Sequence, residues 1–387
     1  MTKEITILAI VLFLLAGIGG CRQSDKHDAL ITVDLMASYH EKELILQDFM
    51  DVEYIVLETN NEFVTQGDIM AIGNKHILVK NLINDGDIFI FDRKTGKGLR
   101  KINRKGRGGE EYNSINGIVL DEDNNEIFVN SSSTKKILVY DLFGNFKRSI
   151  IHTEGAQYLV IFNYDKDNLI CYDMSGYYKV GESRGNQSFH VIISKQDGSV
   201  TRKISIPFNV IKAPVVQEGN GFAMTYVSPI IPYHDNWLLV ETSSDTIYKY
   251  MSKENKLTPF LVKNSTIDTE IFLTMGTIDD RFYFMRTLEN VFDFTKGRGF
   301  PTTDLMYDIH ENAVFNPTII NSDYVKNKTV DMTLHPVNSE IAAFQNLEAN
   351  QLVEAYEKNE LKGKLKEIVA ELHEGSNPVI MVMKYKR

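Results

Sequence analysis

Residues 104–113, RKGRGGEEYN, combine glycines, basic residues and a pair of glutamates ahead of an apolar run. Glycine-rich loops can cradle phosphate when their backbone N–H groups open a helix. The pattern G-x-x-x-x-G-K-[ST] is absent, however, and the stretch precedes an expected strand, where two adjacent glutamates would repel phosphate. We therefore predict a structural corner first and a ligand rim second. Arg107, Glu111 and Tyr112 are expected to brace this corner by an ion pair and a buried ring.

Metal-ligating residues form no recognisable motif. Residues 121–126, DEDNNE, resemble the start of an EF-hand loop, but the sixth position is not glycine and Ser132 stands where the bidentate glutamate belongs. The nine histidines form neither an H-x-H nor an H-E-x-x-H pair. The sequence therefore predicts no metal site and no cofactor.

The sequence also lacks a motif typical of a catalytic nucleophile. The chain has no G-x-S-x-G elbow and no sialidase box of the form S-x-D-x-G-x-x-W. Cys171 lies in the apolar run NLICYD, where a buried and inert thiol is expected. No catalytic residue is identified, although a carboxylate pair assembled from distant segments would leave no trace in the spacing.

Aromatic and basic residues gather instead in two long segments, 174–188 and 287–303. Aromatic planes beside arginine forks suit the recognition of sugars or peptides. The alternative is that these aromatic residues pin their own loops to the protein. Together with the corner at 104–113, the two segments supply the residues of a candidate ligand face. These are Arg107, Glu111, Tyr112, Tyr177, Tyr178, Arg184, Phe294 and Arg298.

The elements that must position these residues are short β-strands that repeat along the chain. Turn-plus-strand units such as GNKHILVK (73–80) and DNNEIFVN (123–130) occur six times, each followed by a second strand. The units are anchored on Ile77, Ile127, Leu169, Trp237, Phe282 and Ile341. Four antiparallel strands in each of six units predict an all-β fold, a six-bladed β-propeller over residues 30–387. A pair of β-sandwiches is the alternative, but it gives no reason for one hairpin to recur six times.

The blade topology assigns each loop to a face. When the strands of a blade run A to D from channel to rim, B–C loops and blade-to-blade crossovers emerge on one face, and A–B and C–D turns on the other. The corner at 104–113, the segments 174–188 and 287–303, and a helical segment at 346–375 all fall on the B–C face. We expect the ligand there, because binding loops on a rigid scaffold usually gather on one side.

The sixth unit needs a fourth strand and carries the helical segment. We expect LITVDL at 30–35 to supply the outer strand and close the ring, which would remove an exposed sheet edge. The helical insertion at 346–375 carries an apolar stripe that includes Leu361, Leu365 and Val369 and must pack on something. Packing on the propeller is the simpler interpretation, and a partner-binding helix is the alternative. Gly363 predicts a break between two short helices.

The N-terminal residues differ from the rest of the chain. Residues 1–20 contain an apolar run from Ile5 to Ile18 that is short for a bilayer-spanning helix but suits a secretory signal. Small residues precede Cys21, as at the lipid attachment site of bacterial lipoproteins, and a polar tether follows at 21–29. An ordinary signal peptide with an incidental cysteine is the alternative. The sequence thus predicts an exported protein joined to a membrane by a lipid on Cys21.

The charge balance excludes some partners. The chain has a formal net charge of −10 at pH 7 and a pI near 5.5. A nucleic-acid-binding protein needs a basic footprint to displace counterions, and adhesion to anionic lipid has the same requirement. We therefore expect no nucleic-acid partner and no electrostatic attachment to membranes.

The chain also resembles a known family. Residues 114–150, SINGIVLDEDNNEIFVNSSSTKKILVYDLFGNFKRSI, look like an NHL-type propeller repeat. The full chain is similar to the six-bladed β-propeller lipoproteins of Bacteroidota, a family without an assigned activity. The similarity lies in DFMDVEYIVLET (48–59), the Gly-Arg-Gly…Glu-Tyr stretch and NPVIMVMKYK (377–386). Family members commonly read Gly-Arg-Gly-Pro-Gly-Glu-Tyr, whereas Gly109 and Glu110 replace Pro-Gly here. The resemblance implies a lipoprotein, in the outer membrane, that faces the periplasm or the cell surface.

Two functions follow as hypotheses. The first is an extracytoplasmic, lipid-anchored propeller that acts as a binding or interaction module for a glycan, a peptide or a protein. The alternative is an enzyme, a hydrolase or lactonase at the channel mouth. Lactonase-like propellers hold a metal in the channel, and Asn116 and Asp279 are residues that could contribute. A channel lined by neutral polar and apolar residues would favour binding, and a cluster of acids or histidines around a metal would favour the enzyme.

Overall fold

The computed structural model describes residues 30–264, 270–334 and 336–386, and the chain divides into two units, the second of which is Thr32–Arg387. The expected signal peptide at 1–20 and the tether at 21–29, which includes Cys21, lie outside the described residues. The six blades belong to the second unit. No helix in the described ranges is both long enough and apolar enough to cross a bilayer.

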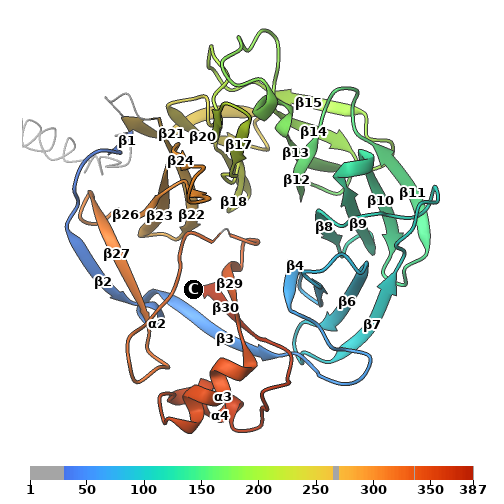
Figure 1. Ribbon diagram of the computed structural model, residues 1–387, viewed down its shortest axis with the longest axis vertical. Coiled ribbons are helices and arrows are strands. Elements are labelled where there is room, and N and C mark those ends of the chain that lie inside the picture. Colours follow the sequence, from blue (N-terminus) through green and yellow to red (C-terminus); the bar gives the residue numbers. More distant parts are fainter. Residues whose placement is uncertain (1–29, 265–269, 335, 387) are drawn as a thin grey trace, which may run out of the picture. The chain divides into compact units, whose positions relative to one another are not determined.

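The described strands of the second unit form six blades around a central channel (Figure 1). The first blade contains β4 (Asp68–Ile72), β5 (His76–Lys80), β6 (Asp87–Asp92) and β7 (Gly98–Asn103). The second contains β8 (Gly117–Asp121), β9 (Glu126–Ser131), β10 (Lys136–Asp141) and β11 (Phe146–Ile151), with the 3-10 turn η1 (Ser132–Thr134). The third contains β12 (Tyr158–Asn163), β13 (Asn168–Asp173), β14 (His190–Ser194) and β15 (Val200–Ile204), with η2 (Met174–Tyr178).

The remaining blades carry the additions. The fourth contains β18 (Ile230–Tyr233), β19 (Asn236–Leu239), β20 (Thr246–Met251) and β21 (Lys256–Asn264), and the fifth contains β22 (Ile271–Ile278), β23 (Phe282–Glu289), β26 (Thr302–Asp308) and β27 (Ala313–Asn321). The sixth contains β29 (Ile341–Leu347), β30 (Val379–Tyr385) and β3 (Met50–Val56). Shorter elements are β1 (Ile31–Asp34), β2 (Glu41–Ile45), α2 (Leu46–Phe49), β28 (Lys328–Thr329) and two hairpins, β16 (Val215–Glu218) with β17 (Gly221–Met224) and β24 (Phe292–Asp293) with β25 (Arg298–Gly299).

The prediction of an all-β, six-bladed propeller with a helical insertion in the last blade is confirmed. Burial explains why the repeat was visible in the sequence. Middle strands such as β9 are buried along their whole length, because a neighbouring blade covers each face, and they read as continuous apolar runs. Outer strands such as β7 and β11 alternate between covered and exposed residues. The core therefore lies between adjacent blades, as in the apolar cluster that the first two blades share.

The ring closes through β3, and the prediction that residues 30–35 supply the closing strand is wrong. β3 pairs antiparallel with β30, from Met50 opposite Tyr385 to Val56 opposite Val379. β1 instead lies beside β21, at the outer edge of the fourth blade. Seven residues of β3 form the ladder, and Tyr54 and Ile55 are buried in the apolar clusters on either side of the blade. The longer strand offers more buried surface than the four residues of β1, so it takes the closing position.

The helical insertion packs on the propeller. It contains α3 (Ala349–Glu357) and α4 (Gly363–Val369). Gly363 has a φ of +58° and is the first residue of α4, so the expected break between two short helices lies directly before it. Leu361, Leu365 and Val369 are buried in one cluster with Met381 of β30, so the apolar stripe covers the sixth blade.

Candidate functional site

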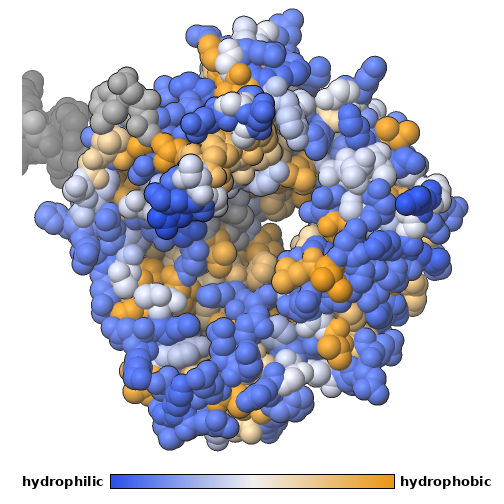
Figure 2. Space-filling model, in the orientation of Figure 1, coloured by the Kyte–Doolittle hydropathy of each residue, from blue (hydrophilic) through white to orange (hydrophobic). Residues whose placement is uncertain are grey.

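The inner strands surround a cavity of about 1060 Å³, and Figure 2 shows the ring hollowed at its centre. The cavity is lined by β4, β8 and β12 and by the turns that follow them, at Asn74, Glu122 and Asp165. Turns of the fourth and sixth blades, at His234 and Ser339, complete the lining. These are A–B turns, so the cavity reaches the A–B face. We call it the funnel.

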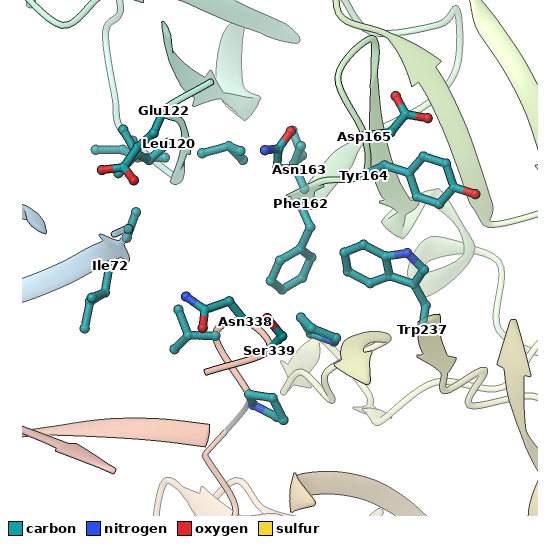
Figure 3. Close-up of a pocket in the computed structure, with 18 of the residues that line it drawn as sticks. Ile72, Leu120, Glu122, Phe162, Asn163, Tyr164, Asp165, Trp237, Asn338 and Ser339 are labelled. Atoms are coloured by element: carbon teal, nitrogen blue, oxygen red, sulfur yellow. The ribbon is translucent and has the colours of Figure 1, made fainter. Parts of the chain in front are cut away.

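Aromatic side chains form one wall of the funnel. Phe162 and Tyr164 come from β12 and its turn, and Trp237 comes from β19. The ring centroids of Phe162 and Trp237 are 5.9 Å apart, and those of Tyr164 and Trp237 are 6.1 Å apart in a stacked arrangement. Figure 3 shows Phe162 and Trp237 beside the same space that Asn338 enters from the sixth blade. Such a wall can pack against an apolar side chain, a sugar ring or a cation.

Most of the remaining lining is neutral. Aliphatic residues from the inner strands and side-chain amides share it, among them Ile72, Leu120, Leu159, Ile161, Val337, Asn130 and Asn338. Ser252 also belongs to the lining, but its hydroxyl oxygen is buried and has no hydrogen-bond partner within the described residues. The arrangement can therefore hold an apolar group and orient it through amides and hydroxyls.

A buried histidine holds one of these amides. Nδ2 of Asn130 donates to the carbonyl of Tyr158 over 2.8 Å, and its Oδ1 lies 3.2 Å from Nε2 of His152. Nδ1 of His152 accepts from the backbone N–H of Tyr158 at 3.3 Å. One ring nitrogen thus accepts and the other donates, which is the neutral imidazole. Burial lowers the pKa of His152 to about 4.

This arrangement predicts acid sensitivity. Between pH 7 and pH 4, the protein should lose about 3 kcal/mol of stability through His152, because the unfolded chain binds a proton near pH 6.5 and the folded one only near pH 4. The measurement is urea unfolding of the wild type and His152→Gln at both pH values. The difference between the two proteins cancels the contribution of other titrating groups, such as Glu241, whose pKa burial raises to about 7. A variant that loses as much stability as the wild type would contradict this assignment.

The corner at 104–113 is a structural junction between the first two blades. Tyr112 is fully buried, donates its hydroxyl to the carbonyl of Gly86 over 2.7 Å and accepts from the backbone N–H of Arg104. Burial raises the pKa of Tyr112 to about 12. Glu111 accepts from the backbone N–H of Gly108 over 2.8 Å, and the expected ion pair with the exposed Arg107 does not form. The buried ring was expected, and a role of these residues in ligand binding stays a prediction.

The other predicted residues come together on the B–C face. Tyr177 is buried and Tyr178 is 64% exposed. Arg184 donates to the carbonyl of Gln187 and covers the ring of Phe208. Phe294 packs against Phe292, with ring centroids 4.8 Å apart, and Arg298 is exposed on β25.

The hairpin β16–β17 joins the two loops and was missed in the sequence. Tyr226, just after β17, contacts Tyr177, Gly221 faces Phe294, and the carbonyl of Val215 accepts from Asn290. The segment VVQEGNGFAM carried a usable signal, a Gly-Asn-Gly turn between short apolar runs. None of the eight residues of the predicted ligand face lines the funnel. The funnel itself was not predicted from the sequence.

The described residues offer no candidate metal site. No group of three or more His, Cys, Asp or Glu side chains lies there in a position to hold a metal ion. Asp279, which the sequence suggested, is largely buried, and burial raises the pKa of its carboxyl. Asn116 is exposed, and its Oδ1 accepts from the backbone N–H of Ser132 over 2.9 Å.

A family model and a solved structure support the six-bladed fold. A family model, DUF5128, described as a 6-bladed beta-propeller, matches residues 22–342. A protein of Bacteroides fragilis described as exported shares 13% identity, with a TM-score of 0.61, over 93% of this chain and 100% of its own. A DUF4221 member from Bacteroides vulgatus shares 9% identity, with a TM-score of 0.48, over 88% of this chain and 98% of its own. No curated protein matches this sequence significantly.

Proposed function

We propose that this chain, which belongs to the DUF5128 family of six-bladed β-propellers, is an extracytoplasmic binding module whose ligand enters the funnel. The ligand is a glycan or a peptide, and a lipid on Cys21 attaches the protein to a membrane. The B–C face, where the sequence suggested a ligand, then serves as a second surface.

The aromatic wall of the funnel, and the aliphatic and amide side chains beside it, carry this proposal. A cavity of about 1060 Å³ with one aromatic wall and several amides has the composition of a ligand pocket, which is mostly apolar with a few polar groups that set orientation. The propeller holds these groups on strands and tight turns of the blades, whose positions the ring fixes. Binding therefore requires little reorganisation of the protein.

The extracytoplasmic location is supported by two observations. The apolar run before Cys21 has the length of a secretory signal. The protein of Bacteroides fragilis that shares the fold is described as exported. Cys171, the cysteine among the described residues, is buried and forms no disulfide. This leaves Cys21 as the cysteine that could carry a lipid.

Lipid attachment gives a direct prediction. Cys21→Ala should move the protein from the membrane fraction to the soluble extracytoplasmic fraction, because the thiol that would carry the acyl chains is gone. The measurement is fractionation followed by immunoblotting, with Cys171→Ala as the matched control. Continued membrane association of Cys21→Ala would refute the anchor.

Ligand binding in the funnel is tested with one aromatic residue from each face. We expect glycan and peptide arrays to identify a ligand that the wild-type protein binds. The affinity of Phe162→Ala for this ligand should be about tenfold lower, ~1.4 kcal/mol, because the ligand loses its aromatic contact. Tyr178→Ala removes an exposed ring on the B–C face and should leave the affinity unchanged. The opposite pattern would place the ligand on the B–C face, and turnover of a substrate from a hydrolase panel would favour the enzyme.

A further inference from the structure

The mouth of the funnel is acidic. Among the described lining residues, one lysine, Lys253, and one histidine, His234, stand against five carboxylates. The carboxylates are Glu122, Asp123, Asp165, Asp235 and Glu340. They come from the turns of four different blades, so the negative charge surrounds the opening. A cleft with charge of one sign above low-dielectric walls concentrates ligands of the opposite sign.

Two of these carboxylates are fixed by the backbone. Glu122 accepts from the N–H groups of Asn74, Lys75 and His76, at 2.7 to 2.9 Å, across the junction of the first two blades. Asp165 accepts from the N–H groups of two residues in its own turn. These bonds hold both side chains at the mouth and leave their negative charge in place.

The other three are open to a ligand. Asp123 is exposed. Glu340 is about half exposed and lies 3.9 Å from Lys384, a distance at which a surface ion pair contributes little. Asp235 pairs with Lys253 at 3.3 Å, but both side chains are at least 75% exposed, so a cationic ligand can compete for the carboxylate.

Directly inside the acidic mouth lies the aromatic wall. Phe162 and Tyr164 line the cavity there, backed by the largely buried Trp237, and aromatic rings attract cations and accept apolar side chains. An anionic glycan would be repelled at the mouth, and a neutral glycan would gain nothing from the five carboxylates. A polypeptide that alternates basic and apolar side chains can contact both the carboxylates of the mouth and the aromatic wall.

We propose that the funnel binds a basic segment of a polypeptide, with lysine or arginine at the carboxylates and an apolar side chain against Phe162 and Trp237. This rests on the proposed function, since it names the ligand class of the same site. The cavity of about 1060 Å³ is at the upper end for a drug-sized ligand and accommodates a short run of residues.

Trp237 is an intrinsic fluorescence probe of the funnel. It is the single tryptophan of the chain and lies in the funnel, so a change in tryptophan emission reports on this cavity. The probes are three capped tetrapeptides, Lys-Phe-Lys-Phe, Ser-Phe-Ser-Phe and Glu-Phe-Glu-Phe, together with spermine. We expect the lysine peptide to bind at least about tenfold more tightly than the serine peptide at low salt. Spermine, which has the charge without the apolar group, should bind more weakly than the lysine peptide.

Matched charge variants test the rim. Asp123→Asn with Glu340→Gln removes two exposed carboxylates at the mouth, and Glu154→Gln with Glu374→Gln removes two exposed carboxylates that do not line the funnel. The first pair of substitutions should lower the affinity for the lysine peptide about fivefold or more, and the second pair should leave this affinity unchanged. The difference should shrink in 1 M salt, where the Debye length is only ~3 Å.

The outcomes separate this inference from the proposed function. Equal affinity for the lysine and serine peptides, or a ligand that shifts Trp237 emission without responding to the rim variants, would overturn the inference and leave the funnel as a binding site. Tighter binding of spermine than of the peptide would replace the polypeptide with a polyamine. If every ligand found on the arrays leaves Trp237 emission unchanged, both the inference and the proposed function fail.

Discussion

Gly96→Ala is expected to lower the free energy of unfolding by about 3 kcal/mol or more. Gly96 lies in the turn between β6 and β7 with a φ of +68°, a conformation that alanine adopts only with strain. A Cβ atom there would lie 1.9 Å from the carbonyl oxygen of Val56 on the closing strand β3. Because that atom belongs to the backbone, the chain must move where the ring closes.

Gly155→Ala is the matched control for this prediction. Gly155 has a φ of +77°, but a Cβ atom there meets open space. Gly155→Ala should therefore lower the free energy of unfolding only by the strain of the left-handed conformation, about 1 kcal/mol. Urea unfolding followed by the fluorescence of Trp237 measures both variants. Equal losses would show that backbone strain, and not contact with β3, explains the glycine at position 96.

The same contact recurs around the ring. Gly144 and Gly198 occupy equivalent turns in the second and third blades, and a Cβ atom on them would meet Ile102 of β7 and Ile150 of β11. In each case a C–D turn packs against the outer strand of the preceding blade. The contact of Gly96 with Val56 therefore identifies β3 as the outer strand of the sixth blade, independently of its pairing with β30.

Sequence reasoning succeeded where the physical signal is local. Anchors such as Ile77 and Ile127 lie at the start of buried middle strands, and the Asp, Asn and Gly residues before them form tight turns. The closing strand was misidentified because residues 30–35 and 50–56 both have strand patterns. Its partner β30 lies more than 300 residues away, and nothing local selects one segment over the other.

The funnel could not be predicted for a different reason. Whether the space between inner strands is filled depends on side chains from five blades at once, such as Ile72, Leu120 and Phe162. Loop length pointed to the opposite face, because long insertions are visible in a sequence and a hollow is not. The insertions do contact one another there, through the hairpin that was missed.

Lys195→Met is the second substitution expected to have a large effect, about 3–5 kcal/mol of destabilisation. Nζ of Lys195 lies 2.5 Å from Oδ2 of Asp121, and the two side chains are only 5% and 1% exposed. It also donates to the carbonyl of Asp165 over 2.6 Å. Removing the ammonium leaves a buried carboxylate without its counter-charge and frees a turn at the mouth of the funnel.

Two further variants decide whether burial is the cause. Lys253→Met breaks an ion pair of the same type at the surface, where both partners are at least 75% exposed, and should cost less than about 1 kcal/mol. Asp121→Asn combined with Lys195→Met removes both charges and should recover part of the loss, since no unpaired buried charge remains. Urea unfolding of the four proteins gives the comparison. If Lys195→Met and Lys253→Met lose equal stability, the buried pair does not hold the second and third blades together.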